Sequence, residues 1–250
     1  MRPKIQPMDM YTPSLAGRFK DCRRKVETAI ISDSRFYTII PVACSGGNDL
    51  ARRLIVGLTG ASGAIYGIRL IEILADNTDF EIHLTLSQAS ARVLAEEVGI
   101  QVDPDNFSIA DLIGRDASNV IYHHPDDIGA SIASGSFRTL GMVIVPCSMG
   151  TVASTAMGLS RNLVQRAADV CLKERRRLVL VVRETPLSTI HLENMLKLSQ
   201  AGAVILPAMP AFYHFPETIE DQINFVVSKA LDQFGIDAQL IRRWKEASRA

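Results

Sequence analysis

From residue 54 onward, short apolar runs alternate with segments of helical periodicity, and this alternation restricts the fold more than any other feature of the chain. Five runs are expected to be strands, at residues 54–59, 81–86, 141–145, 178–182 and 203–206. Helices are expected at residues 63–75, 88–98, 151–172, 188–199 and 216–234. Strands that are apolar throughout are typical of a parallel sheet buried on both faces, so the pattern predicts an α/β domain.

Two stretches lack this regularity. Residues 100–140 form an irregular segment too long for an idle loop in a compact domain, and we expect it to be functional. Residues 1–53 carry ten Lys and Arg against five Asp and Glu, with four prolines. We therefore expect residues 1–52 to be a poorly ordered N-terminal extension ahead of a domain at residues 53–250. The alternative is an organelle presequence, against which Asp9, Asp21 and Glu27 count, so the expected location is cytoplasmic, with mitochondrial as the alternative.

Composition excludes several classes of protein. A chain of 250 residues with 47% hydrophobic residues is globular, and its formal net charge of zero disfavours nucleic acid or an anionic membrane as a partner. The apolar runs stop short of the roughly 20 residues of a membrane span. Four cysteines without a CxxC pair indicate a reducing compartment. No metal is expected, because the adjacent His123 and His124 would point to opposite faces of an extended segment.

Ligands of an open parallel sheet bind beyond the carboxyl ends of its strands. The run Thr-Gly-Ala-Ser-Gly-Ala at residues 59–64 follows the first expected strand and opens a helix, which favours phosphate binding at the helix amides. A second turn, Pro-Cys-Ser-Met-Gly-Thr at residues 146–151, follows the third expected strand. Side by side, the two turns would cradle a phosphate and a flat ring, although the second is equally compatible with a simple helix cap.

Other chemistries fit these turns less well. A dinucleotide site would need Gly-x-Gly-x-x-Gly and an acid after the second strand, where Ser87 stands. A serine hydrolase elbow around Ser62 would need glycine in place of Ala64. Cys147 has no committed histidine partner, and a buried structural thiol is the favoured interpretation.

Charged and aromatic residues follow the later strands, and each has two interpretations. Arg183 and Glu184 supply a cation and an acid–base group at the ligand edge, or form a surface ion pair. The basic run at residues 173–177 is by default a solvated helix end. The aromatic turn at residues 210–216, with Lys229 on the next helix, is either a clamp for a second phosphate or a hydrophobic lid.

Taken together, the motifs resemble those of the UbiX-type flavin prenyltransferases over roughly residues 53 to 245. The matching segments are residues 59–64, Ser134-Gly135-Ser136, Pro146-Cys147-Ser148, residues 166–170 and 172–176, Arg183-Glu184-Thr185-Pro186, residues 191–195 and Phe212-Tyr213-His214.

The resemblance implies a Rossmann-like three-layer α/β sandwich with a mostly parallel sheet and helices on both faces. It implies an enzyme, without a metal, that joins dimethylallyl phosphate to reduced FMN across flavin N5 and C6 and releases phosphate. The product, prenylated FMN, would serve a partner UbiD-type decarboxylase in ubiquinone biosynthesis or aromatic acid decarboxylation. The protein would form a homo-oligomer, a dodecamer in most members, with sites between subunits.

Matching positions carry the roles of the family's residues. FMN would be held by Gly60, Ala61, Ser62, Ser87, Ser148, Met149, Gly150, Thr151 and Arg183. Tyr213 and Lys229 would hold the prenyl phosphate. The catalytic residues would be Ser62, Glu97, Arg166, Lys173 and Glu184. Of these, Glu184, or the departing phosphate relayed by Ser62, would accept the proton that leaves the ring carbon.

Two departures from the family and two alternative functions matter. Lys229 stands where many members have arginine, and Ile128 stands where some have tryptophan. Flavin-dependent cysteinyl decarboxylases share the expected fold, but their catalytic histidine and Pro-x-Met-Asn-x-x-Met-Trp clamp are not visible here. A non-catalytic FMN-binding regulatory protein is the other alternative, although it would not need to keep the full set of catalytic residues.

Overall fold

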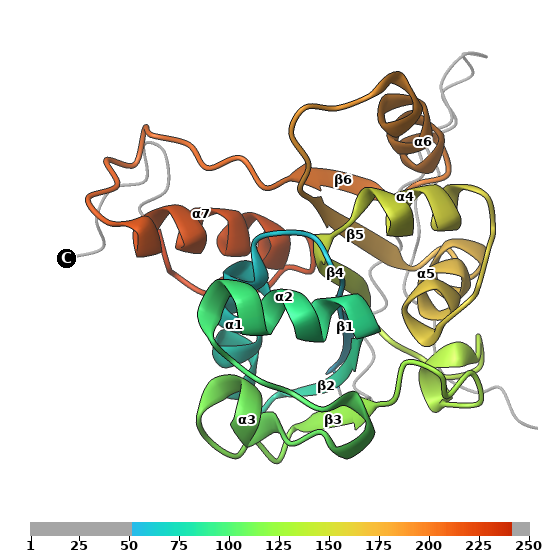
Figure 1. The fold of residues 1–250 in the computed structure, drawn as a ribbon, viewed down its shortest axis with the longest axis horizontal. Helices are drawn as coiled ribbons and strands as arrows, with labels where there is room; N and C mark the ends of the chain where they lie inside the picture. The colour runs from blue at the N-terminus through green and yellow to red at the C-terminus, as the bar shows by residue number, and fades with distance from the viewer. Residues whose placement is uncertain (1–51, 242–250) are drawn as a thin grey trace, which may run out of the picture. The chain divides into compact units, whose positions relative to one another are not determined.

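The computed structural model describes residues 52–241, which contain one six-stranded sheet of order β3-β2-β1-β4-β5-β6 (Figure 1). Every neighbouring pair of strands is parallel. This is the strand order of the Rossmann fold, so the expected fold is confirmed, with a sheet that is wholly parallel within the described residues. The strands are β1 (Arg52–Leu58), β2 (Phe80–Leu86), β3 (Val120–His123), β4 (Gly141–Cys147), β5 (Arg177–Val182) and β6 (Val204–Pro207).

Helices cover both faces of the sheet and make the other two layers (Figure 1). One face packs against α1 (Ala64–Ala75), α2 (Gln88–Val98), α3 (Ile109–Ile113) and α7 (Ile219–Asp232). The other packs against α4 (Met149–Ala156), α5 (Leu163–Lys173), α6 (Thr189–Gln200) and the short 3₁₀ helix η2 (Ser131–Ala133). A second 3₁₀ helix, η1, spans Pro104–Asn106.

Successive side chains of the central strands point to opposite faces of the sheet, and both faces are buried. This explains why these strands are apolar throughout. In β1, Leu54 and Val56 enter the core beneath α1 and α7, whereas Ile55 enters the core beneath α4 and α5. In β5, Val179 and Leu180 divide between the two cores in the same way. A strand with a buried layer on each face has no place for a polar stripe.

The structure corrects two of the expected elements. The single helix expected at residues 151–172 is two helices, because Gly158 adopts a φ of +69° after α4 and Asn162 caps a new helix by accepting from the Gln165 amide. The irregular stretch at residues 100–140 contains β3, which the pattern missed. This edge strand has four residues that are only partly buried or exposed, so it lacks the apolar run that marks the others.

Residues 1–51 and 242–250 lie outside the described part of the chain. The prediction of a poorly ordered extension therefore falls outside it too, except at Arg52, which belongs to β1 rather than to the extension. Within residues 52–241, none of the helices has the length and apolar character needed to cross a membrane.

Candidate active site

The two small-residue turns lie side by side at the carboxyl edge of the sheet, and Thr59 ties them together. Its hydroxyl donates to the Pro146 carbonyl at 2.8 Å and accepts from the Ser148 amide at 2.9 Å. The Thr59 amide also donates to the Pro146 carbonyl, at 3.3 Å. The threonine is 2% exposed, so it is a fixed brace between the ends of β1 and β4. We call the two braced turns, residues 59–63 and 146–151, the cradle.

Small residues and helix caps shape the cradle. A Cβ on Gly60 would lie 2.5 Å from the Cβ of Ala89 at the start of α2, so only glycine lets the backbones approach this closely. Ser87 caps α2 by accepting from the Ser90 amide, and Ser148 caps α4 by accepting from the Thr151 amide. The remaining predicted FMN contacts of these turns lie around them: Ala61, Met149 and Thr151 are buried, and Gly150 is exposed.

Glu97 reaches the start of α1 from the end of α2. Its carboxylate accepts from the amides of Gly63 at 2.8 Å and Ala64 at 3.0 Å, and from the Ser62 side chain. Burial would raise the pKa of Glu97, but these hydrogen bonds and the Arg183 charge hold it below its usual range. In this structure the Gly63 and Ala64 amides therefore bond to the protein's own carboxylate, and phosphate binding at the first turn stays a prediction.

Arg183 and Glu184 follow β5 and approach the cradle. The Arg183 amide donates to the Cys147 carbonyl at 3.3 Å, and its Nε donates to the Ser62 carbonyl at 3.2 Å. The guanidinium is also close enough to Tyr66 to counteract part of the rise in the tyrosine pKa that burial causes. Glu184 is exposed, and its carboxylate accepts from the Thr185 amide at 3.2 Å. The Arg183 side chain thus borders the cradle, and the adjacent Glu184 carboxylate bonds to the Thr185 amide.

Tyr213 and Lys229 meet at the ring of Phe225. The Tyr213 ring lies edge-on to Phe225 with centroids 5.8 Å apart, and Lys229 Nζ lies 5.7 Å from the same centroid. Lys229 is also 3.8 Å from an Asp232 carboxylate oxygen. The two predicted phosphate ligands are therefore brought to one aromatic side chain, which sequence reasoning did not single out.

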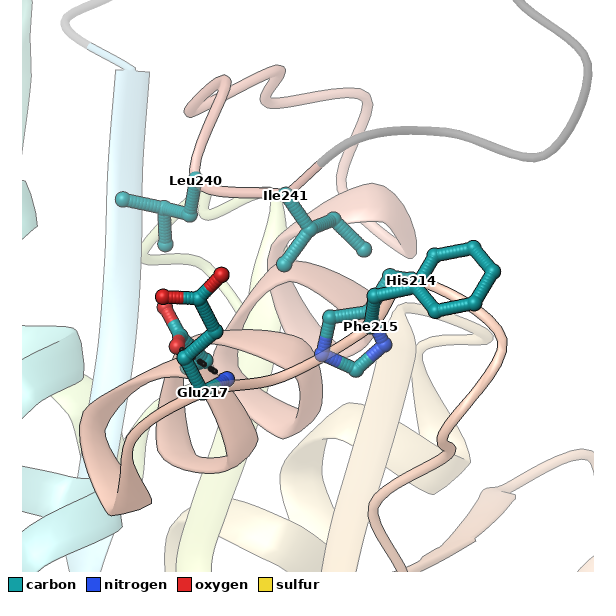
Figure 2. Close-up of a pocket in the computed structure, with 6 residues that line it drawn as sticks. His214, Phe215, Glu217, Leu240 and Ile241 are labelled. Carbon is teal, nitrogen blue, oxygen red and sulfur yellow. Dashed lines mark hydrogen bonds between the residues drawn. The ribbon is translucent and has the colours of Figure 1, made fainter.

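A pocket of about 270 Å³ lies beside this aromatic turn (Figure 2). Its walls are His214, Phe215, Glu217, Asp221, Leu240 and Ile241. The imidazole of His214 stacks on Phe225 with centroids 5.2 Å apart, so pocket and turn share one aromatic stack. Asp221 is committed to capping α7, because its carboxylate accepts from the amides of Glu217 and Thr218.

Arg166 and Lys173 both lie on α5, and Lys173 lies away from the cradle of its own chain. Arg166 Nε donates to the Ala133 carbonyl at 3.2 Å, and Lys173 pairs with Glu174. Lys173 ends α5 shortly before β5 begins, whereas Arg183 follows the end of β5. Because β5 has six residues, this strand separates the two positions by about 20 Å. Within one chain, Lys173 and Arg183 therefore lie at opposite edges of the sheet.

The two cysteines within residues 52–241 take no part in this chemistry. Cys147 and Cys171 are buried free thiols, and burial raises the pKa of both, that of Cys171 to about 12. Cys147 is therefore a structural residue rather than a nucleophile. Among residues 52–241, His, Cys, Asp and Glu side chains form no group of three that would hold a metal ion.

Sequence reasoning missed the brace and the aromatic anchor of this site. Thr59 was part of a quoted motif, but its role depends on an oxygen 87 residues away in the chain. The signal that could have identified it is a polar residue directly after an apolar strand. For Phe225 no comparable signal exists, because one aromatic residue on an amphipathic helix is usually part of the core.

The comparisons with known proteins agree with this geometry. A family model described as Flavoprotein matches residues 43–230. The flavin prenyltransferase UbiX of Halalkalibacterium halodurans is 53% identical over 191 residues, which are 76% of this chain and 92% of that protein.

Two solved structures are also similar to the chain. A dodecameric FMN-dependent UbiX-like decarboxylase from Escherichia coli O157:H7 is 47% identical with a TM-score of 0.70, covering 78% of this chain and 100% of that one. AnUbiX (PadA1), in complex with FMN and dimethylallyl pyrophosphate, is 44% identical with a TM-score of 0.70, covering 79% of this chain and 99% of that one. This chain belongs to the UbiX-type flavin prenyltransferases of the Flavoprotein family.

Proposed function

We propose that the protein joins dimethylallyl phosphate to reduced FMN, releasing phosphate and giving prenylated FMN. The observation that carries this proposal is the cradle at the carboxyl edge, which contains Ser62 and is bordered by Arg183, in a chain 44% identical to a protein solved with FMN and dimethylallyl pyrophosphate. The two ligands of that relative are the two kinds of molecule that the proposed reaction joins.

The residues present fit FMN. The close approach at Gly60 and the Thr59 brace hold the two turns side by side, so one ligand could contact the backbone of both. The first amides of α4 have no acceptor within the helix and are therefore available to a phosphate. We assign FMN binding to Gly60, Ala61, Ser62, Ser87, Ser148, Met149, Gly150, Thr151 and Arg183. When bound, reduced FMN supplies the electron-rich N5 and C6 atoms to which the prenyl group is joined.

The chain's own side chains supply the charge and the proton acceptor for the reaction. Loss of phosphate from an allylic carbon is favoured by cations beside the leaving oxygen, and Arg183 and Lys229 carry that charge. Glu184, which is exposed and directly follows Arg183, accepts the proton that leaves the ring carbon. Glu97, held ionised at the start of α1, orients the Ser62 hydroxyl and is not free to donate a proton near neutral pH.

The position of Arg166 and Lys173 leads us to propose a shared site. Since about one strand length separates Lys173 from the cradle of its own chain, we propose that Lys173, and Arg166 on the same helix, act in the cradle of another subunit. Exposed apolar side chains on α6, including Ile190, Leu192 and Leu196, offer surface for such an assembly. We propose a homo-oligomer, and a dodecamer as in the similar structure from E. coli O157:H7.

Mixing two inactive variants tests the shared site. Lys173→Met removes a cation, and Tyr213→Phe removes a hydroxyl on a different part of the chain. Mixed oligomers of the two variants contain some sites in which neither change is present, so we expect activity to return on subunit exchange. If the mixture is as inactive as its parts, Lys173 acts within its own chain.

The first experiment is an anaerobic incubation of the protein with reduced FMN and dimethylallyl phosphate, followed by mass spectrometry of the released flavin. We expect a five-carbon adduct and stoichiometric phosphate, and a parallel reaction with dimethylallyl pyrophosphate identifies the preferred leaving group. FMN that binds and returns unmodified would contradict the proposal. Release of CO₂ from an aromatic acid by the FMN-loaded protein would favour a decarboxylase, the activity named for the structure from E. coli O157:H7.

We further propose that prenylated FMN passes to a UbiD-type decarboxylase, in ubiquinone biosynthesis or in aromatic acid decarboxylation. A UbiD-type apoenzyme that becomes active only when mixed with the reaction products would support this step. Determining the N-terminus of the protein purified from its own cells would test whether residues 1–52 are retained, as a cytoplasmic protein would retain them, or are removed on import into mitochondria.

A further inference from the structure

A chain of polar side chains crosses three strands of the sheet, apart from the cradle and the aromatic turn. Arg53 Nε donates to Glu81 Oε1 at 2.8 Å, and His83 Nε2 lies 2.8 Å from the same oxygen. His83 Nδ1 in turn lies 2.8 Å from His123 Nε2. His83 is 3% exposed, and burying so polar a group is costly unless it is hydrogen-bonded. No step of the proposed reaction uses these residues.

The partners determine which imidazole atoms carry hydrogens. Glu81 is an acceptor, because hydrogen bonds from His83 and Arg53 outweigh the effect of burial and hold its pKa below the usual range. His83 Nε2 therefore donates to Glu81, which leaves Nδ1 of the neutral ring as an acceptor. His123 Nε2 must then donate to His83 Nδ1. Burial lowers the pKa of both histidines, so both rings are neutral. The hydrogen bonds then run from His123 to His83 and from His83 to Glu81.

Two of these hydrogen-bonded side chains, His83 and Arg53, contact the ring of Phe137. His83 meets that ring edge-on, with centroids 4.9 Å apart, and the Arg53 guanidinium lies 4.6 Å from its centroid. Phe137 is the last residue of the turn formed by residues 134–137, where its amide donates to the Ser134 carbonyl at 3.2 Å. Arg176 donates to the carbonyls of Gly135 and Phe137. The 134–137 turn is therefore held on one side by the contacts of the Phe137 ring. On the other side it is held by the hydrogen bonds from Arg176, which follows α5.

The same turn lies against two of the proposed catalytic cations. A Cβ on Gly135 would come within 2.7 Å of Lys173 Nζ, so the ammonium group lies directly on the turn backbone. Arg166 Nε donates to the carbonyl of Ala133, just before the turn, at 3.2 Å. A shift of the turn would therefore move the surface on which both cations rest.

We propose that His83 and His123 are positioning residues, which fix the 134–137 turn through Phe137 and thereby place Arg166 and Lys173. The inference rests on the proposed function where it assigns those two cations to the substrate phosphate. The placement of the turn itself is a separate claim and is measured separately.

A pair of substitutions at residue 123 isolates the hydrogen bond. His123→Gln keeps an amide N–H near the position of Nε2, whereas His123→Leu leaves His83 Nδ1 without a donor. His124→Gln is the matched control, because His124 contacts Asp105 and the Asp126 amide instead. Each full-length variant is compared by hydrogen exchange of the peptide covering residues 131–140, by FMN affinity, and by KM and kcat for dimethylallyl phosphate.

We expect His123→Leu to accelerate exchange in residues 131–140 and to raise KM about fivefold or more, with FMN affinity unchanged, because an unpaired buried acceptor loosens the turn and not the cradle. His123→Gln and His124→Gln should stay within about twofold of the unsubstituted protein. Unchanged exchange in His123→Leu, or equal effects of Leu and Gln, would overturn the inference.

A second variant covers the case in which His123→Leu does not fold. Phe137→Leu keeps an apolar side chain but removes the ring that His83 and Arg53 contact, and the same faster exchange is expected. Protection equal to that of the unsubstituted protein would overturn the inference. If the unsubstituted protein fails to prenylate FMN, the proposed function is refuted, while the exchange data still decide whether the imidazole pair positions the turn.

Discussion

The brace between the two turns of the cradle gives the most direct quantitative prediction. Thr59→Val keeps the shape of the side chain and removes its hydroxyl. The Ser148 amide then loses its acceptor, which costs about 1–2 kcal/mol for a partly buried donor. The Pro146 carbonyl loses one of two donors, since the Thr59 amide remains at 3.3 Å, at a further cost of about 1 kcal/mol. The sum is about 2–3 kcal/mol of the free energy of unfolding.

Part of this loss should appear in ligand binding, because FMN must hold together two turns that are no longer tied. If about half of it does, the FMN dissociation constant rises about tenfold. Urea unfolding measures the first quantity, and quenching of flavin fluorescence on titration measures the second. Thr59→Ser is the control, since it keeps the hydroxyl and loses one methyl group, worth about 1 kcal/mol. A valine variant with the stability and FMN affinity of the unsubstituted protein would show that the two turns are held by something else.

Three further predictions concern the charged residues. Glu184→Gln should bind FMN normally but stall before ring closure, and full turnover of reduced FMN would remove Glu184 from the mechanism. Because the folded pKa of Glu97 is lowered, its contribution to stability is present above its unfolded pKa of about 4.3 and is lost as pH falls through the folded value. Urea midpoints should therefore fall more steeply below about pH 4 in the unsubstituted protein than in Glu97→Gln, and parallel curves would contradict the assignment. Lys229→Arg replaces a point charge with a guanidinium that can donate two parallel hydrogen bonds to a phosphate, so it should tighten dimethylallyl phosphate binding about threefold, as measured by calorimetry. Weaker binding would place the phosphate elsewhere.

Most strands of the sheet were predictable, because each central strand has a recognisable local sequence pattern. An apolar run of strand length followed by a small-residue turn marks β1 and β4 without reference to the rest of the chain. The exceptions show the limit of this reasoning. β3 is a short strand at the edge of the sheet, so half of the burial signal is missing, and the break between α4 and α5 depends on the backbone at Gly158 rather than on hydrophobic period.

The candidate site, too, was only partly predictable from the sequence. Parallel strands bring their carboxyl ends to one edge, so the sequence alone placed Ser62, Ser148 and Arg183 together once the strands were identified. It could not say that the carboxylate at the start of α1 is Glu97, or that Lys173 lies about one strand length from the cradle of its own chain.

The features that follow from the amino-acid sequence are those that act over a few residues: strand and helix periods, the turns after the strands, and the types of chemical group available for a flavin and a phosphate. Which of these groups meet depends on the folded chain, as in the contact of Thr59 with Pro146 and in the contact of His83 with His123 beside Phe137. Hydrogen bonds and ring contacts depend on ångström distances between residues that can be far apart in the chain, 121 positions for Arg183 and Ser62, and local patterns carry no information about such distances.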